Sequence, residues 1–126
     1  MSNYTVKHMD ELAALHHGAV KLVGAELGIE SFGVQVLTFP AGFADYPEHD
    51  HAEDGQEELY VVLEGSGEFT IDGESVPVDP SQVLRVAPGA RRKLTPGPDG
   101  VRFLAIGCSS DQPYERPQDF RLAVNR

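Results

Sequence analysis

The sequence contains no tryptophan, one cysteine, and half as many basic residues as acidic ones. The single cysteine, Cys108, cannot form an internal disulfide bond, so the fold must be stable without one. Ten lysines and arginines stand against 20 aspartates and glutamates, which gives a formal net charge of −10. Nucleic acids and anionic membrane surfaces attract clustered positive charge, which this chain lacks. We therefore expect neither of them as a partner.

Long hydrophobic runs are also missing. No apolar stretch approaches the roughly 20 residues of a membrane-spanning helix. The first residues, MSNYTVKHMDEL, lack the charged and then apolar pattern of a signal peptide. We therefore expect a cytoplasmic protein, and we interpret Cys108 as a small buried hydrophobic residue at the end of a strand in a reducing compartment.

Short β-forming segments separated by turn residues make up most of the chain. Its 126 residues, 40% of them hydrophobic, are the usual size of one domain with one core. Asp72-Gly73 between two β segments predicts a tight hairpin. Many short strands with almost no helix favour an all-β sandwich or barrel. The expected strands cover 19–27, 31–39, 58–65, 67–71, 74–78, 82–87, 91–96 and 101–107.

The two ends of the chain look different from this core. Residues 9–17 predict one short helix, on which the adjacent His16 and His17 point in different directions and make a poor chelating pair. We interpret both histidines as surface or partly buried residues. We expect one domain, with an N-terminal helix or arm over 1–18, a barrel over 19–107 and a tail over 108–126. The tail either wraps the barrel or pairs with a second subunit through Tyr114, Phe120 and Leu122.

A cluster of candidate metal ligands lies near the middle of the sequence. Side chains two residues apart on a strand point the same way, so His49 and His51 share a face, as do Glu58 and Tyr60. If 45–51 and 58–64 form a hairpin, both imidazoles and the Glu58 carboxylate converge. Two histidines and one carboxylate are a ligand set for divalent iron, zinc or manganese.

These residues resemble the first motif of the cupin family. That motif is a glycine, His-x-His, a short gap, a glutamate, six residues and a glycine. Here Gly42 precedes His49 and His51, and six residues separate Glu58 from Gly65. The resemblance implies a cupin-type double-sheet jelly-roll β-barrel, with Glu58 rather than Glu57 as the ligand. The gaps before His49 and after His51 are slightly longer than in the family pattern.

The second cupin motif is altered. The segment from Pro88 to Arg92 resembles it, but Arg92 takes the place of the family's third histidine, and Pro96 takes the place of its asparagine. A guanidinium cannot ligate a metal and stays protonated. Arg91 and Lys93, on either side of Arg92, point to the other side of the strand. We expect Glu57 to be solvated or else paired with Arg91 or Lys93.

Two arrangements of these residues remain open. In the first, His49, His51 and Glu58 hold a metal ion, and Arg92 binds an anionic ligand. In the second there is no metal, Arg92 pairs with Glu58, and a histidine is free to act as a general base. Tyr60 is either an acid or hydrogen-bond donor to the substrate, or a core aromatic residue.

The function expected from this pattern is a site for a divalent metal, whether iron, zinc, manganese or nickel, and a small anionic organic ligand. His49, His51 and Tyr60 are the candidate catalytic residues, and Arg92 and Tyr60 the candidate substrate-binding residues. The resemblance to cupins leaves isomerisation, dehydration and dioxygenation open as reactions. The alternatives are a non-enzymatic binding or sensing protein and a metal-free cupin. We also expect a homodimer, because pairing covers exposed edge strands.

Overall fold

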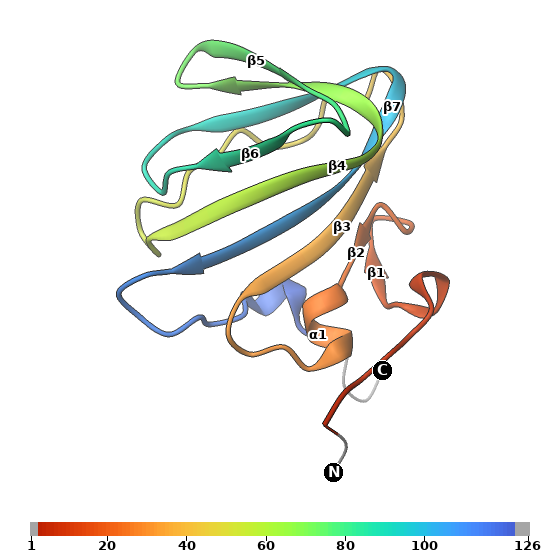
Figure 1. The fold of residues 1–126 in the computed structure, drawn as a ribbon, viewed down its shortest axis with the longest axis vertical. Coiled ribbons are helices and arrows are strands. Elements are labelled where there is room, and N and C mark those ends of the chain that lie inside the picture. The colour runs from red at the N-terminus through yellow and green to blue at the C-terminus, as the bar shows by residue number, and fades with distance from the viewer. Residues whose placement is uncertain (1–2, 123–126) are drawn as a thin grey trace.

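Antiparallel strands dominate the computed structural model, which describes residues 3–122 (Figure 1). The strands of this part of the chain are β1 (Ala14–Leu15), β2 (Val20–Lys21), β3 (Gly33–Phe39), β4 (Gln56–Ile71), β5 (Glu74–Val78), β6 (Val83–Val86) and β7 (Arg92–Ser109). Its helical segments are α1 (Val23–Leu27) and two short 3₁₀ turns, η1 (Met9–Glu11) and η2 (Gln118–Phe120). The expected all-β fold is confirmed.

The strands form one hydrogen-bonded sheet in the order β1-β2-β3-β7-β4-β5, and β6 pairs with the first half of β4. β4 lies between β6 and β7 in its first half, and between β5 and β7 in its second half. The two long strands, β4 and β7, therefore connect both halves of the sheet.

A sharp bend in β4 and β7 folds this sheet over itself. Tyr60 and Phe69 both belong to β4, yet their ring centroids are 4.7 Å apart, whereas a straight strand would separate them by about 30 Å. The register shifts on both sides of Glu64 and Gly65 mark the bend. Gly65 has φ +74°, and a Cβ there would lie 2.1 Å from the carbonyl oxygen of Gly100. Only glycine permits this approach of the two strands.

The core fills the space between the two halves of the bent sheet. Tyr60, Phe69 and Phe103 pack there with ring centroids no more than 6.4 Å apart. The curvature seen in Figure 1 gives the double-sheet barrel that the sequence predicts.

The predictions for the first 27 residues are partly wrong. Instead of one helix over 9–17 there are η1, the short strand β1 and a turn in which His16 and His17 have positive φ. The strand expected over 19–27 is β2 followed by α1. This helix packs Gly24 against Val34 of β3, so its hydrophobic residues cover the outer face of the sheet.

The other strand predictions hold with changed boundaries. The hairpin at Asp72-Gly73 is confirmed, with φ +49° and +85°. The expected strands 58–65 and 67–71 are one strand, β4, and 91–96 and 101–107 are one strand, β7. The prediction that Cys108 is buried is wrong. It pairs with the exposed Glu57 on the outer face of the sheet, which nothing in the described part of the chain covers there.

The C-terminal segment after β7 packs on the chain's own barrel. The Arg116 guanidinium donates to the carbonyl oxygen of Ile29, and Gln112 donates to that of Asp54. Tyr114 lies against Gly33, where a Cβ would be 2.8 Å from the tyrosine hydroxyl. Of the two alternatives for the tail, the wrapped one is therefore present in residues 110–122. No helix in the described residues has the length and hydropathy of a membrane span.

Candidate metal centre

Glu58 stands on the inner face of β4, opposite Gly107 of β7, where the absence of a neighbouring side chain leaves room beside its carboxylate. Both histidines lie on the segment before β4, which is a loop held by backbone hydrogen bonds. The His49 amide donates to Arg92 (3.0 Å), the Arg92 amide donates to His49 (2.8 Å), and the His51 amide donates to Pro88 (2.8 Å). The predicted hairpin of 45–51 with 58–64 is therefore wrong, because β6 and β7 occupy both edges of β4 there.

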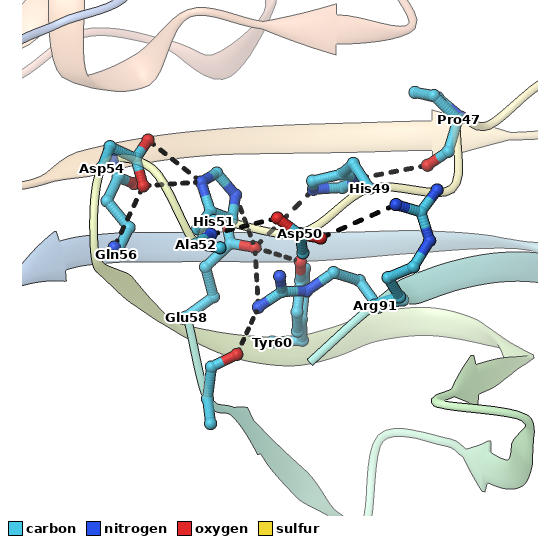
Figure 2. Close-up of polar contacts among 12 residues, drawn as sticks. Pro47, His49, Asp50, His51, Ala52, Asp54, Gln56, Glu58, Tyr60 and Arg91 are labelled. Atoms are coloured by element: carbon cyan, nitrogen blue, oxygen red, sulfur yellow. Dashed lines mark hydrogen bonds and ion pairs between the residues drawn. The ribbon is translucent and has the colours of Figure 1, made fainter. Parts of the chain in front are cut away.

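The three candidate ligands nevertheless converge on one point (Figure 2). One ligand atom from each of His49, His51 and Glu58 lies within 4.8 Å of the other two. The Nε2 atoms of His49 and His51 are 3.9 and 3.2 Å from Oε1 of Glu58. The two rings are nearly perpendicular, with centroids 5.1 Å apart.

Hydrogen bonds on the far side of each ring turn both Nε2 atoms toward this point. Nδ1 of His49 lies 3.0 Å from the carbonyl oxygen of Pro47, and Nδ1 of His51 lies 3.1 Å from both carboxylate oxygens of Asp54. Because these acceptors need a proton on Nδ1, the neutral rings keep their Nε2 lone pairs free. Metal-binding histidines in proteins are held in this way.

An orphaned nitrogen shows that the residues present fit a metal ion. Nε2 of His51 is buried and has no hydrogen-bond partner in the described structure, although it lies 3.2 Å from Glu58. A neutral imidazole would direct its lone pair at a carboxylate oxygen, which is repulsive. Either a proton or a cation must lie between them, and a nitrogen-nitrogen-oxygen set suits divalent iron, zinc, manganese or nickel.

Arg92 lies beside the carboxylate and is completely buried. Its Nη2 is 3.6 Å from Oε1 of Glu58 and donates to the carbonyl oxygen of Ala87 at 3.3 Å. Nε and Nη1 have no partner in the described structure. The inward orientation expected from the strand alternation is confirmed, but Arg92 is not among the residues that line the cavity. Its guanidinium acts on the site through Glu58.

The site shifts the pKa values of its own groups. Burial raises the pKa of Glu58, but the nearby imidazole of His51, the hydrogen bond from Tyr60 and the charges of His51 and Arg92 outweigh it, and the net shift of this pKa is downward. The Glu58 carboxylate, 3.2 Å from Nε2, raises the pKa of His51, with a smaller contribution from Asp54, against the effect of burial. In the metal-free protein the pair therefore favours a charged imidazole beside a charged carboxylate.

Two buried tyrosines, Tyr60 and Tyr46, lie near the Glu58 carboxylate. The Tyr60 hydroxyl donates to Oε1 of Glu58 at 2.5 Å, and burial, with the nearby charge of Glu58 and Tyr46, raises its pKa. Burial also raises the pKa of Tyr46 to about 12. Tyr60 is 2% exposed and does not border the cavity. It packs as a core aromatic whose hydroxyl orients Glu58.

The charges that flank the site agree with the prediction in part. Glu57 is exposed to solvent, which is one of the two expected alternatives, but its ion pair is with Arg85 on β6 and not with Arg91 or Lys93. Arg91 lies near Glu48 and Asp50 at 3.5 and 3.6 Å. The Lys93 ammonium donates to the carbonyl oxygens of Ala44 and Tyr46, which fixes the loop that leads to the histidines.

A cavity of about 750 Å³ opens directly beside the three ligands. Gln35, Leu37 and Phe39, which share one face of β3, line it. His49, His51 and Glu58 belong to the less exposed part of its lining, which we call the deep end. The C-terminal segment closes one side with Tyr114, Pro117 and Phe120. A mostly apolar cavity with a few convergent polar groups is the usual form of a small-molecule site.

Several residues of the site escape the sequence analysis. Asp54 holds His51, and its place in a turn three residues after the histidine is the signal that was available. The Tyr46 ring lies near that of His49, with centroids 5.9 Å apart and planes tilted by 52°, and its position three residues before the histidine is the available signal. His16 and His17 are exposed, as expected, but they border the cavity, which their sequence positions do not reveal.

The sequence matches the cupin domain family over residues 35–107, which is more than half of the chain and includes all three candidate ligands. The protein belongs to the cupin family. Among curated proteins, none matches it significantly.

Solved cupin structures share its architecture. A cupin protein from Bacteroides fragilis has 26% sequence identity, a TM-score of 0.72, and full coverage of both chains. A sugar phosphate isomerase from Silicibacter pomeroyi has 22% identity and a TM-score of 0.61, covering 72% of this cupin and 59% of that chain. A DMSP lyase from Ruegeria pomeroyi has 24% identity and a TM-score of 0.56, covering 66% and 41%. The last two show likeness of fold alone.

Proposed function

We propose that this cupin holds a divalent metal ion with His49, His51 and Glu58, and that it binds a small organic acid in the adjoining cavity. The observation that carries the proposal is the orientation of the imidazoles. Each Nδ1 is held by a separate acceptor, so that both Nε2 atoms face Oε1 of Glu58. Such preorganisation is what a metal site requires.

The charge of the site favours an anionic ligand. Arg92 already lies beside Glu58 and balances its negative charge. The charge of a divalent ion would therefore stay uncompensated by the protein, and a bound carboxylate or phosphate would compensate it. Arg92 contributes to anion binding through this balance, from a position behind the cavity wall.

The chain's own residues bind and orient such a ligand. Leu37, Phe39 and Phe43 provide apolar walls that exclude water from its body. Tyr60 and Asp54 hold Glu58 and His51 in place. A metal bound here would act as a Lewis acid or bind oxygen. Isomerisation and elimination are the reactions to assay first, because solved neighbours include an isomerase and a lyase, and dioxygenation follows.

One observation favours the metal-free alternative. Because the pKa of His51 is raised, a proton on its imidazole can take the place of the metal ion beside Glu58. In that form His51 would be an acid or base at the deep end of the cavity.

Elemental analysis separates the two alternatives. The protein is purified without a chelating column, and the metal content is measured for the wild type and for His49→Ala and His51→Ala. The metal-free protein is then titrated with Mn²⁺, Zn²⁺ and Fe²⁺ by calorimetry. His8→Ala, an exposed histidine outside the cavity, is the matched control.

We expect about one metal per chain in the wild type and in His8→Ala, and a loss of at least about 100-fold in affinity when either ligand histidine is removed. Equal metal content in the wild type and in the two ligand variants would refute the metal site. Turnover assays with sugar phosphates and small acids then separate an enzyme from a binding protein.

A further inference from the structure

The mouth of the cavity has a distinct composition. We define the mouth as those lining residues that are exposed: His16, His17, Asp45, Pro47, Pro117 and Asp119. They come from three separate parts of the chain, namely the β1–β2 turn, the segment after β3 and the C-terminal segment. Four of the six, the two histidines and the two aspartates, have side chains that can accept hydrogen bonds, and the imidazoles can also donate one each.

The mouth offers acceptors and negative charge. The carboxylates of Asp45 and Asp119 can only accept, and a neutral imidazole presents one acceptor nitrogen. No lysine or arginine is present among the described residues that line the cavity. A ligand group that donates hydrogen bonds can be accepted by all four of these side chains, and a positive charge on it is favoured over a negative one.

The deep end has the opposite preference. There Arg92 balances Glu58, and the orphaned Nε2 of His51 faces the position of the metal ion proposed above. Between the two ends the wall is apolar, with Leu15, Leu37 and Phe43. The cavity thus runs from an anion-binding deep end, through an apolar middle, to an acceptor-rich mouth.

The histidines of the mouth occupy a strained turn. His16 and His17 have φ of +53° and +58°, followed by Gly18 at +92°. Non-glycine residues with positive φ cost on the order of 1 kcal/mol or more each, and such strain concentrates at functional sites. Glycine or asparagine at these two positions would lower the backbone strain of the turn. The two imidazoles at the mouth are therefore present although they reduce the stability of the fold.

We propose that the ligand is a bifunctional acid with a carboxylate at one end, an apolar chain, and an amine at the other end, as in an ω-amino acid. The carboxylate end rests on the metal site proposed above. The amine end rests on the mouth alone, where Asp45, Asp119 and the two imidazoles accept its hydrogen bonds.

Matched probes test this assignment. The probes are ω-aminohexanoate, ω-hydroxyhexanoate, hexanoate and adipate, together with the corresponding set built on octanoate. Binding is measured by calorimetry on metal-free and Mn²⁺-loaded protein, for the wild type and for Asp45→Asn with Asp119→Asn. The control variant, Glu68→Gln with Glu74→Gln, removes the same charge from exposed positions outside the cavity.

We expect the amino acid to bind about tenfold more tightly than the monoacid, and the diacid to bind most weakly, because each exposed carboxylate adds a modest interaction with an ammonium group. The mouth variant should lose this order, and the control should keep it. A further variant, His16→Asn with His17→Asn, keeps a residue that tolerates positive φ and should lose part of the preference.

The results distinguish this inference from the metal site. An amine preference that disappears in the mouth variant supports the inference in either metal state, because the mouth does not contact the metal. Equal binding of the amine, hydroxyl and diacid probes at both lengths would overturn it even if the metal binds as proposed. Absence of measurable binding for all probes would also overturn it. Failure of the metal titration alone refutes only the proposed metal site.

Discussion

A double-mutant cycle on Glu58 and Arg92 tests the electrostatic reasoning behind the site. The Arg92 side chain is fully buried, and its Nη2 lies 3.6 Å from Oε1 of a carboxylate that is 13% exposed. At an effective dielectric constant of about 20, two unit charges at this distance interact by about 4–5 kcal/mol. Removing one partner leaves the other charge buried without compensation.

The two single variants should therefore differ. Glu58→Gln leaves the guanidinium without the one carboxylate that pairs with it in residues 3–122, and we expect a loss of about 3 kcal/mol in the free energy of unfolding. Arg92→Met removes two unsatisfied donors and leaves Glu58 with Tyr60 and His51, so we expect a loss of about 1 kcal/mol. The double variant should also lose about 1 kcal/mol, which gives a coupling of about 3 kcal/mol.

Urea unfolding of the metal-free protein in the presence of a chelator, followed by circular dichroism, measures these free energies. The exposed pair Glu57–Arg85, on β4 and β6, supplies a matched control with the same residue types. Its cycle should give a coupling below about 1 kcal/mol. A coupling between Glu58 and Arg92 as small as that of the control would show that solvent screens the guanidinium, and the charge balance argued here would fail.

Three further predictions concern the ligand support, the bend and pH. Asp54→Asn should weaken metal binding about 10- to 100-fold in calorimetric titrations, because Asp54 orients His51, whereas Asp50→Asn should not. Gly65→Ala should cost about 4 kcal/mol in urea unfolding, because its Cβ would lie 2.1 Å from a backbone oxygen at positive φ, whereas Gly73→Ala, with open space, should cost about 1–2 kcal/mol; similar costs would contradict the close approach. The raised pKa of His51 stabilises the metal-free protein below the unfolded pKa, and this contribution is lost as pH rises through the folded pKa. The lowered pKa of Glu58 stabilises it above the unfolded pKa, and that contribution is lost as pH falls. Urea midpoints should therefore be highest near about pH 5–6 and decline toward about pH 8, and His51→Gln should remove this decline.

The sequence was most informative where alternation and spacing have a direct geometric meaning. The two-residue alternation placed Glu58 and Tyr60 on one face and Arg92 inward, and both hold in the structure. The six-residue spacing between Glu58 and Gly65 also has a physical basis. The same strand carries the ligand and then bends where only glycine allows β7 to approach.

The predictions of secondary structure are wrong where tertiary packing decides the local structure. The residues of α1 read as a strand because hydrophobic side chains on a short helix and on a buried strand look alike, although Gly28, with φ +76°, marks the helix end. The glycines near the bend read as turns that end strands, but in β4 and β7 they allow the strands to continue through it. The path of the loop that carries His49 and His51 depends on its pairing with Arg92 and Pro88, which lie far along the chain.

The pairing of this loop restricts how a ligand can move between the cavity and the solvent. The loop that carries His49 and His51 is bound to the segment 88–92 by the reciprocal bonds between His49 and Arg92 and by the bond from His51 to Pro88. The Arg92 side chain of that segment is completely buried. If this loop moved outward, three backbone hydrogen bonds would break and the buried Arg92 guanidinium would move toward water. We therefore expect ligands to enter through the mouth, which is bordered by the β1–β2 turn, the segment after β3 and η2, and substitutions in these segments should change the rates of ligand association and dissociation.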